Sequence, residues 1–150
     1  MSRLPATRRN LQQAFEKHKA CYDSLKGNHN RSRRLILFYA VETGLKVFLL
    51  DKIGKYSVED LIQHHEYCYL KDNGHDIKRM LKWASIDGQY KLKTLRCEKS
   101  IQVEPNQYHQ LWRYGLDTTN DADEQNTESV LCGIVEFLSP KIAKKKNNRS

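Results

Sequence analysis

The stretch that decides the fold is Arg34–Leu50, RLILFYAVETGLKVFLL, the longest apolar run in the sequence. At 3.6 residues per turn, its apolar side chains spread over nearly the whole circumference of a helix, which indicates a helix covered by others. Two charged residues, Glu42 and Lys46, interrupt the run, whereas a membrane span needs about 20 largely apolar residues. We therefore expect this helix to be buried in protein, and we expect no membrane contact.

Glu42 and Lys46 stand four residues apart, with the acid on the N-terminal side. Side chains at this spacing are neighbours on a helix surface, so the two charges can pair. A charge in dry surroundings must be paired or must have a purpose. Both residues are therefore candidate binding residues, and the alternative is a mutually neutralised pair in a crowded core.

Other segments repeat apolar residues at helical spacing behind a capping residue, which predicts further helices. From residue 88 to 105 this period disappears, so a long loop or a small hairpin is expected there. The sequence therefore predicts an all-α bundle of four to five helices in a single domain over residues 1–150. The further helices run from about Thr7 to Lys26, from Ser57 to Leu70, from Asp76 to Ala84 and from Val130 to Pro140, a proline that we expect to end the last one.

The net charge of +8 is concentrated at the two ends of the chain. Residues 1–34 carry nine Lys or Arg against two acids, the last ten carry five against none, and the body between is mildly acidic. Such asymmetry favours contact with a polyanion, and nucleic acid is the commonest one. Arg31, Arg33 and Arg34 are candidate phosphate contacts in the basic N-terminal region. The alternative is that the basic ends only keep the chain in solution.

Cysteine and histidine usage favours neither disulfides nor a metal centre. Four scattered cysteines without a CxxC pair indicate reduced thiols, and the charged N-terminus lacks the apolar segment of a secretory signal, so we expect a cytoplasmic protein. His64, His65 and Cys68 could begin a zinc site, but no second ligand pair stands at the required spacing. We expect no metal and no cofactor. Without a Gly-rich phosphate loop or a GxSxG elbow, nucleotide and ester hydrolysis have no support.

Two segments resemble motifs of the HEPN family of small helical bundles. Ala40–Leu50, AVETGLKVFLL, is similar to the family's charged central helix, and Gly74–Ala84, GHDIKRMLKWA, is similar to its Gly-His-Asp helix. The resemblance covers about Arg31 to Ala84 well and the rest in outline. It implies a HEPN-like bundle, often a homodimer, from a family that supplies RNases of toxin–antitoxin and antiviral defence systems and also non-catalytic binding modules.

Active HEPN RNases carry an arginine followed four to six residues later by a histidine, and this sequence lacks that pattern. Its nearest counterpart is inverted, His109-Gln-Leu-Trp-Arg113. On a helix His109 and Arg113 share one face and could hold one phosphate, so they are the tentative catalytic pair. Whether the protein is an enzyme stays open at this point.

The aromatic residues beside Arg113 give the segment a second interpretation. Trp112 and Tyr114 offer stacking platforms next to a forked cation, as in single-stranded RNA recognition. The alternative is that both rings anchor a loop while Arg113 pairs with a buried acid such as Glu42.

Three functions therefore remain. We favour a module that binds RNA or another polyanion. The alternatives are a divergent metal-independent RNase that uses His109 and Arg113, and a non-catalytic subunit that docks a partner protein.

Overall fold

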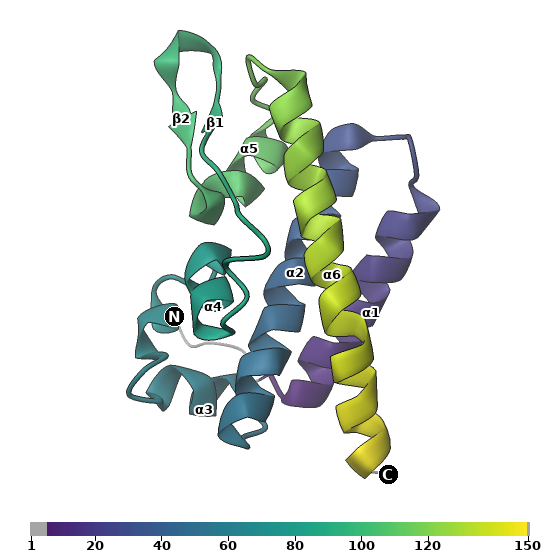
Figure 1. Cartoon of the computed structure of the whole chain (residues 1–150), viewed down its shortest axis with the longest axis vertical. Helices are drawn as coiled ribbons and strands as arrows, with labels where there is room; N and C mark the ends of the chain where they lie inside the picture. Colours follow the sequence, from purple (N-terminus) through teal and green to yellow (C-terminus); the bar gives the residue numbers. More distant parts are fainter. Residues whose placement is uncertain (1–5, 150) are drawn as a thin grey trace.

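The computed structural model describes residues 6–149, with side chains for residues 6–143. This range is mostly helical, as predicted, with a single small two-stranded sheet. The three long helices lie side by side and the shorter elements pack on one side of them (Figure 1). The α-helices are α1 (Arg8–Ser24), α2 (Asn30–Ile53), α3 (Val58–Gln63), α4 (Ile77–Trp83), α5 (Tyr108–Tyr114) and α6 (Asp121–Arg149), and the 3-10 helices are η1 (Cys68–Lys71), η2 (Glu98–Ser100) and η3 (Pro105–Gln107).

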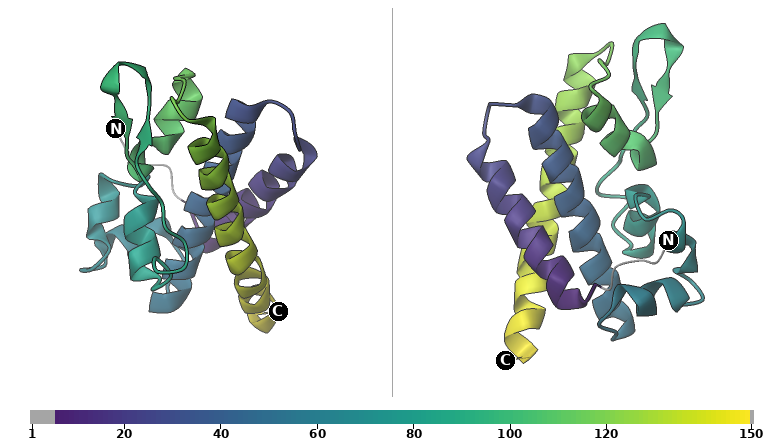
Figure 2. Two further views of the ribbon diagram at one scale, coloured as in Figure 1. Left: turned by 45° about the horizontal axis from the view of Figure 1, so that its top comes forward. Right: turned by 180° about the vertical axis from the view of Figure 1, so that it is seen from behind.

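Helix α2 is the central element and contacts each of the other five α-helices. Its neighbour α1 runs back along it, as the view from behind shows (Figure 2). Gly44 allows this packing, since a Cβ atom there would lie 2.7 Å from Phe15 of α1 and 2.9 Å from Leu138 of α6. The prediction of a covered central helix is therefore confirmed.

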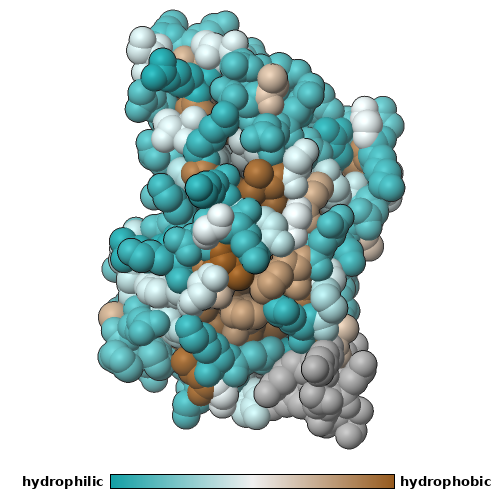
Figure 3. Space-filling view, in the orientation of Figure 1, coloured by the Kyte–Doolittle hydropathy of each residue, from teal (hydrophilic) through white to brown (hydrophobic). Residues whose placement is uncertain are grey.

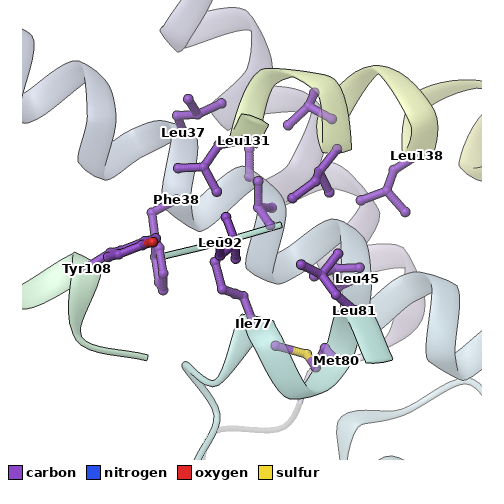
Figure 4. Close-up of a cluster of buried hydrophobic side chains, with 14 of the residues drawn as sticks. Leu37, Phe38, Leu45, Ile77, Met80, Leu81, Leu92, Tyr108, Leu131 and Leu138 are labelled. Atoms are coloured by element: carbon purple, nitrogen blue, oxygen red, sulfur yellow. The ribbon is translucent and has the colours of Figure 1, made fainter. Parts of the chain in front are cut away.

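Apolar side chains from the other five α-helices, from η1 and from the linker after α4 join those of α2 in one continuous core. Burying one Leu, Ile, Phe or Met side chain contributes about 1.5–3 kcal/mol to stability relative to leaving it exposed. Figure 4 shows part of this core: Leu37, Phe38 and Leu45 of α2, Ile77, Met80 and Leu81 of α4, Leu92, Tyr108 of α5, and Leu131 and Leu138 of α6.

The predicted helix starts are confirmed by their capping bonds. The Thr7 hydroxyl accepts a hydrogen bond from the Asn10 amide, and the Ser57 hydroxyl accepts one from the Asp60 amide. The Asp76 carboxylate caps α4 in the same way. Each bond satisfies an amide that the helix itself leaves without a partner.

The linker after α4 forms a small hairpin, which confirms the expectation for residues 88–105. Strand β1 (Leu95–Arg96) pairs antiparallel with β2 (Gln102–Val103), so that Leu95 faces Val103. The hairpin leads directly into η3 and α5, and so it determines where α5 lies, the helix that carries His109, Trp112 and Arg113.

Three predicted helix boundaries are wrong. The last helix begins at Asp121, nine residues before the expected start at Val130. Pro140 does not end the last helix, because α6 continues to Arg149 with Pro140 inside it. Ile142 is buried one turn beyond Leu138 and extends the apolar stripe, and this burial offsets the hydrogen bond that proline cannot donate. The helix that begins at Ser57 stops at Gln63, and the chain then turns into η1.

No helix within the described residues is long and apolar enough to cross a membrane. On the face shown in Figure 3, apolar surface gathers near the middle and hydrophilic surface surrounds it.

Candidate functional site

The site is built around Glu42, a carboxylate on the central helix that is only 8% exposed. Lys46, one turn further along α2, places its Nζ 3.0 Å from Glu42 Oε2, so the predicted pair forms. The turn before α4 brings His75 to the other carboxylate oxygen, with His75 Nδ1 2.5 Å from Glu42 Oε1. Glu42 therefore has a partner at each oxygen.

The charge on Glu42 determines how the ring of His75 is used. Burial opposes ionisation of Glu42, but hydrogen bonds and charge from His75 and Lys46 outweigh it, and the pKa of Glu42 lies below its ordinary value. An ionised carboxylate can only accept hydrogen bonds, so Nδ1 of His75 carries a proton and donates a hydrogen bond to Glu42. The second ring nitrogen of His75, Nε2, is then available to a ligand, and the side chain is 46% exposed.

His109 of α5 packs its ring against His75, with ring centroids 4.1 Å apart, and against Phe38 at 5.4 Å. It is 5% exposed. Burial first, then the charges of His75 and Arg113, lower the pKa of His109 to about 4, so its ring is neutral at pH 7. Among the described side chains, its Nδ1 is the only buried nitrogen or oxygen without a hydrogen-bond partner.

Arg113 lies one turn beyond His109 on the same helix and is exposed to solvent. It does not pair with Glu42, the alternative raised by the sequence, but donates from Nη2 to the Tyr39 hydroxyl at 2.5 Å. The ring of His18 from α1 lies beside Tyr39, with centroids 6.0 Å apart. We call the set of Glu42, Lys46, His75, His109 and Arg113 the Glu42 site.

A cleft of about 250 Å³ opens next to the Glu42 site. Its walls are the turn between η1 and α4 on one side and η3 with the start of α5 on the other. It is lined by Asp72, Asn73, Gly74, His75, Asp76, Asn106, Gln107, His109 and Gln110.

Arg33 and Arg34 do not lie where a polyanion could reach them, which corrects the expectation that they contact phosphate. Both are buried and bind acids of α6. Arg33 binds Glu128 at 2.9 Å, and Arg34 binds Glu128 at 2.7 Å and Glu124 at 3.0 Å. The third member of that group, Arg31, is exposed and pairs with Asp117.

The two aromatic residues beside Arg113 have different environments. Trp112 is 3% exposed and its indole nitrogen donates to Glu124, so it anchors α5 to α6 and cannot serve as a stacking platform. Tyr114 is 67% exposed and remains available for stacking. The basic C-terminal tail lies outside the described side chains beyond residue 143.

Sequence reasoning missed His75 as a member of the site. The residue stood in the Gly-His-Asp segment, which pointed to a helix start but not to contact with Glu42. No group of three or more His, Cys, Asp or Glu in the described part of the chain could hold a metal ion.

The Glu42 site combines the imidazole of His75, which Glu42 orients, the neutral imidazole of His109 and the exposed guanidinium of Arg113. This arrangement can bind a phosphate group and can move a proton near it.

Searches against family models, curated proteins and solved structures found no match to this chain.

Proposed function

We propose that this protein binds single-stranded RNA, or another phosphate-bearing chain, at the Glu42 site. The observation that carries the proposal is that His75 bonds the buried Glu42 and packs on the ring of His109 from a remote segment, with the exposed Arg113 one turn further along α5. A buried carboxylate with two cationic or imidazole partners is costly to assemble. Its position beside an open cleft favours a functional role over a purely structural one.

Arg113 is suited to hold a phosphate. A guanidinium presents its donors as a planar fork and can bind two phosphate oxygens at once. Its contact with the neutral Tyr39 hydroxyl positions the fork without cancelling its charge. The exposed ring of Tyr114 next in the chain can stack on a base, which contributes about 1–3 kcal/mol per base.

The cations of α4 extend the positive surface past the cleft. Lys78, Arg79 and Lys82 are exposed, and the helix begins two residues after His75. Within the described residues none of the three forms an ion pair, although Arg79 lies over the ring of Tyr69. These three exposed cations can make the phosphate contacts that we expected of Arg33 and Arg34, which are buried.

The HEPN resemblance agrees with this proposal. The Gly-His-Asp segment supplies His75, and the charged central helix supplies Glu42 and Lys46. We accordingly propose a HEPN-like helical bundle, acting as a homodimer in a toxin–antitoxin or antiphage defence system.

A divergent RNase is the second candidate, and the bond between Glu42 and His75 favours it. An imidazole oriented by a carboxylate is an effective general base or acid. With a pKa of about 4, His109 is a poor base at neutral pH. In this version His75 transfers the proton, Arg113 stabilises charge on the phosphate, and His109 supports the ring of His75.

Binding of a fluorescent oligouridine, measured by anisotropy at several salt concentrations, tests the proposal. Replacing Arg113 with alanine removes one phosphate contact and should weaken binding about 5- to 10-fold, with a salt slope reduced by roughly 1. Arg9→Ala is the matched control, because Arg9 is exposed on α1. Equal losses in both variants would contradict the proposal. RNA that stays intact after incubation with the protein in EDTA would favour binding over metal-independent cleavage.

A further inference from the structure

The cleft beside the Glu42 site has a charge pattern that does not suit a phosphate. Two of its lining residues, Asp72 and Asp76, are acids, and none of them is a lysine or an arginine. A phosphate placed there would be repelled by the carboxylates at short range. The part of an RNA chain that enters the cleft must therefore be its uncharged part.

Three polar groups of the cleft are left for a ligand. The side chains of Asp72, Asn106 and Gln110 are exposed and make no hydrogen bond or ion pair with the described part of the chain. By contrast, the Asp76 carboxylate accepts from the Tyr69 hydroxyl and from the Arg79 amide. The available groups consist of one carboxylate and two amides from opposite walls.

The unsatisfied nitrogen of His109 points to the same conclusion. His109 lines the cleft and is only 5% exposed, and its Nδ1 has no hydrogen-bond partner among the described residues. Buried polar groups in native proteins are nearly always hydrogen-bonded, so an exception calls for a missing partner. Because Nδ1 is buried, a ligand in the cleft supplies this partner only by shifting the ring of His109.

The volume limits the size of the ligand. Pockets for drug-sized molecules span about 300–1,000 Å³, and this cleft has about 250 Å³. It suits a single small ring system. Arg113 lies four residues after His109, about 6 Å further along α5, and is exposed, so it can bind a phosphate attached to a ring in the cleft.

We propose that the cleft binds one unstacked nucleobase whose Watson–Crick edge presents N–H donors, with guanine preferred. This inference rests on the proposed function and identifies the base that accompanies the phosphate at Arg113. The Asp72 carboxylate accepts from two adjacent N–H groups of guanine, which uracil does not offer. Asn106 and Gln110 supply the remaining donors and acceptors.

The test compares two twelve-nucleotide RNAs, all uridine and the same with one central guanosine, by competition anisotropy. We expect the guanosine RNA to bind about 10-fold more tightly, the usual size for one charge-assisted contact. Asp72→Asn should reduce this preference to less than about 2-fold and leave the affinity for oligouridine unchanged. Asp87→Asn, an exposed acid that does not line the cleft, is the matched control.

The outcomes separate this inference from the proposed function. If oligouridine binds through Arg113 but guanosine brings no gain, or if Asp72→Asn retains the gain, the base site is overturned and the phosphate site stands. If neither RNA binds, the proposed function fails and the base site fails with it. A second variant, Asn106→Ala with Gln110→Ala, should lower the preference without lowering the affinity for oligouridine.

Discussion

Glu42 organises the site because it is charged in surroundings that disfavour charge. Its two partners come from different distances along the chain: Lys46 is one helical turn away, while His75 is 33 residues away. Helical spacing determines the first contact, so the sequence predicted it. The second depends on how the turn before α4 folds back on α2, and no local pattern encodes that.

His109 makes a pH dependence testable at the level of one residue. Its pKa of about 4 lies below the value of about 6.5 expected in the unfolded chain. Between those values the unfolded state binds a proton that the folded state does not bind, so the protein loses stability as the pH falls from about 6.5. His18, whose pKa is lowered by burial, acts in the same direction.

Replacing His109 with phenylalanine should remove its share of this loss. We expect the free energy of unfolding of the wild type to fall by on the order of 1 kcal/mol more than that of His109→Phe between pH 6.5 and pH 5. Urea unfolding at the two pH values measures the difference. Ordinary carboxylates are mostly ionised over this range and titrate alike in both proteins, so a parallel fall in both proteins would contradict the assigned pKa shift.

At the level of the helices, α2 and α6 are joined by a buried ionic cluster. Burial alone would raise the pKa of Glu128, but bonds from Arg33, Tyr22 and Arg34 outweigh it and lower the pKa to about 2. The sequence predicted that both arginines contact phosphate, because they belong to the basic N-terminal region. The acids that compensate them lie about 95 residues later in the sequence.

The cluster predicts a strong dependence on Glu128. Glu128→Gln leaves two buried guanidinium groups short of a charge partner, which should lower the free energy of unfolding by about 3 kcal/mol. The control is Glu136→Gln, an exposed acid two turns further along α6 that should change the stability by less than about 0.5 kcal/mol. Chemical denaturation provides both values. A loss below 1 kcal/mol at Glu128 would show that the cluster is not structural.

Helix boundaries show which features a sequence can predict. Starts were correct where a side chain caps the backbone locally, as at Thr7, Ser57 and Asp76. The expected stop at Pro140 was wrong, since the burial of Ile142 against the core outweighs the local effect of proline. Local chemistry is readable from the sequence, whereas packing between distant segments is not.

Over the whole molecule, the position of a charge matters more than the net charge of +8. The charge asymmetry correctly separated a basic N-terminal region from an acidic body, but three of its arginines, Arg8, Arg33 and Arg34, are buried in ion pairs. The exposed cations near the cleft lie instead on α4 and α5. Of the expected site residues, Glu42 and Lys46 pair, and His109 packs on the ring of His75, which bonds Glu42, while Arg113 and Tyr114 are exposed further along α5.

The central claim is that RNA binds where His75 and His109 meet. The most direct measurement is a nitrogen-15 spectrum of the imidazole groups during titration with single-stranded RNA. We predict that the signals of His75 and His109 shift, while those of His64 and His65, which stack on each other away from the cleft, do not. Unchanged signals from His75 and His109, or equal shifts in all four histidines, would contradict the account.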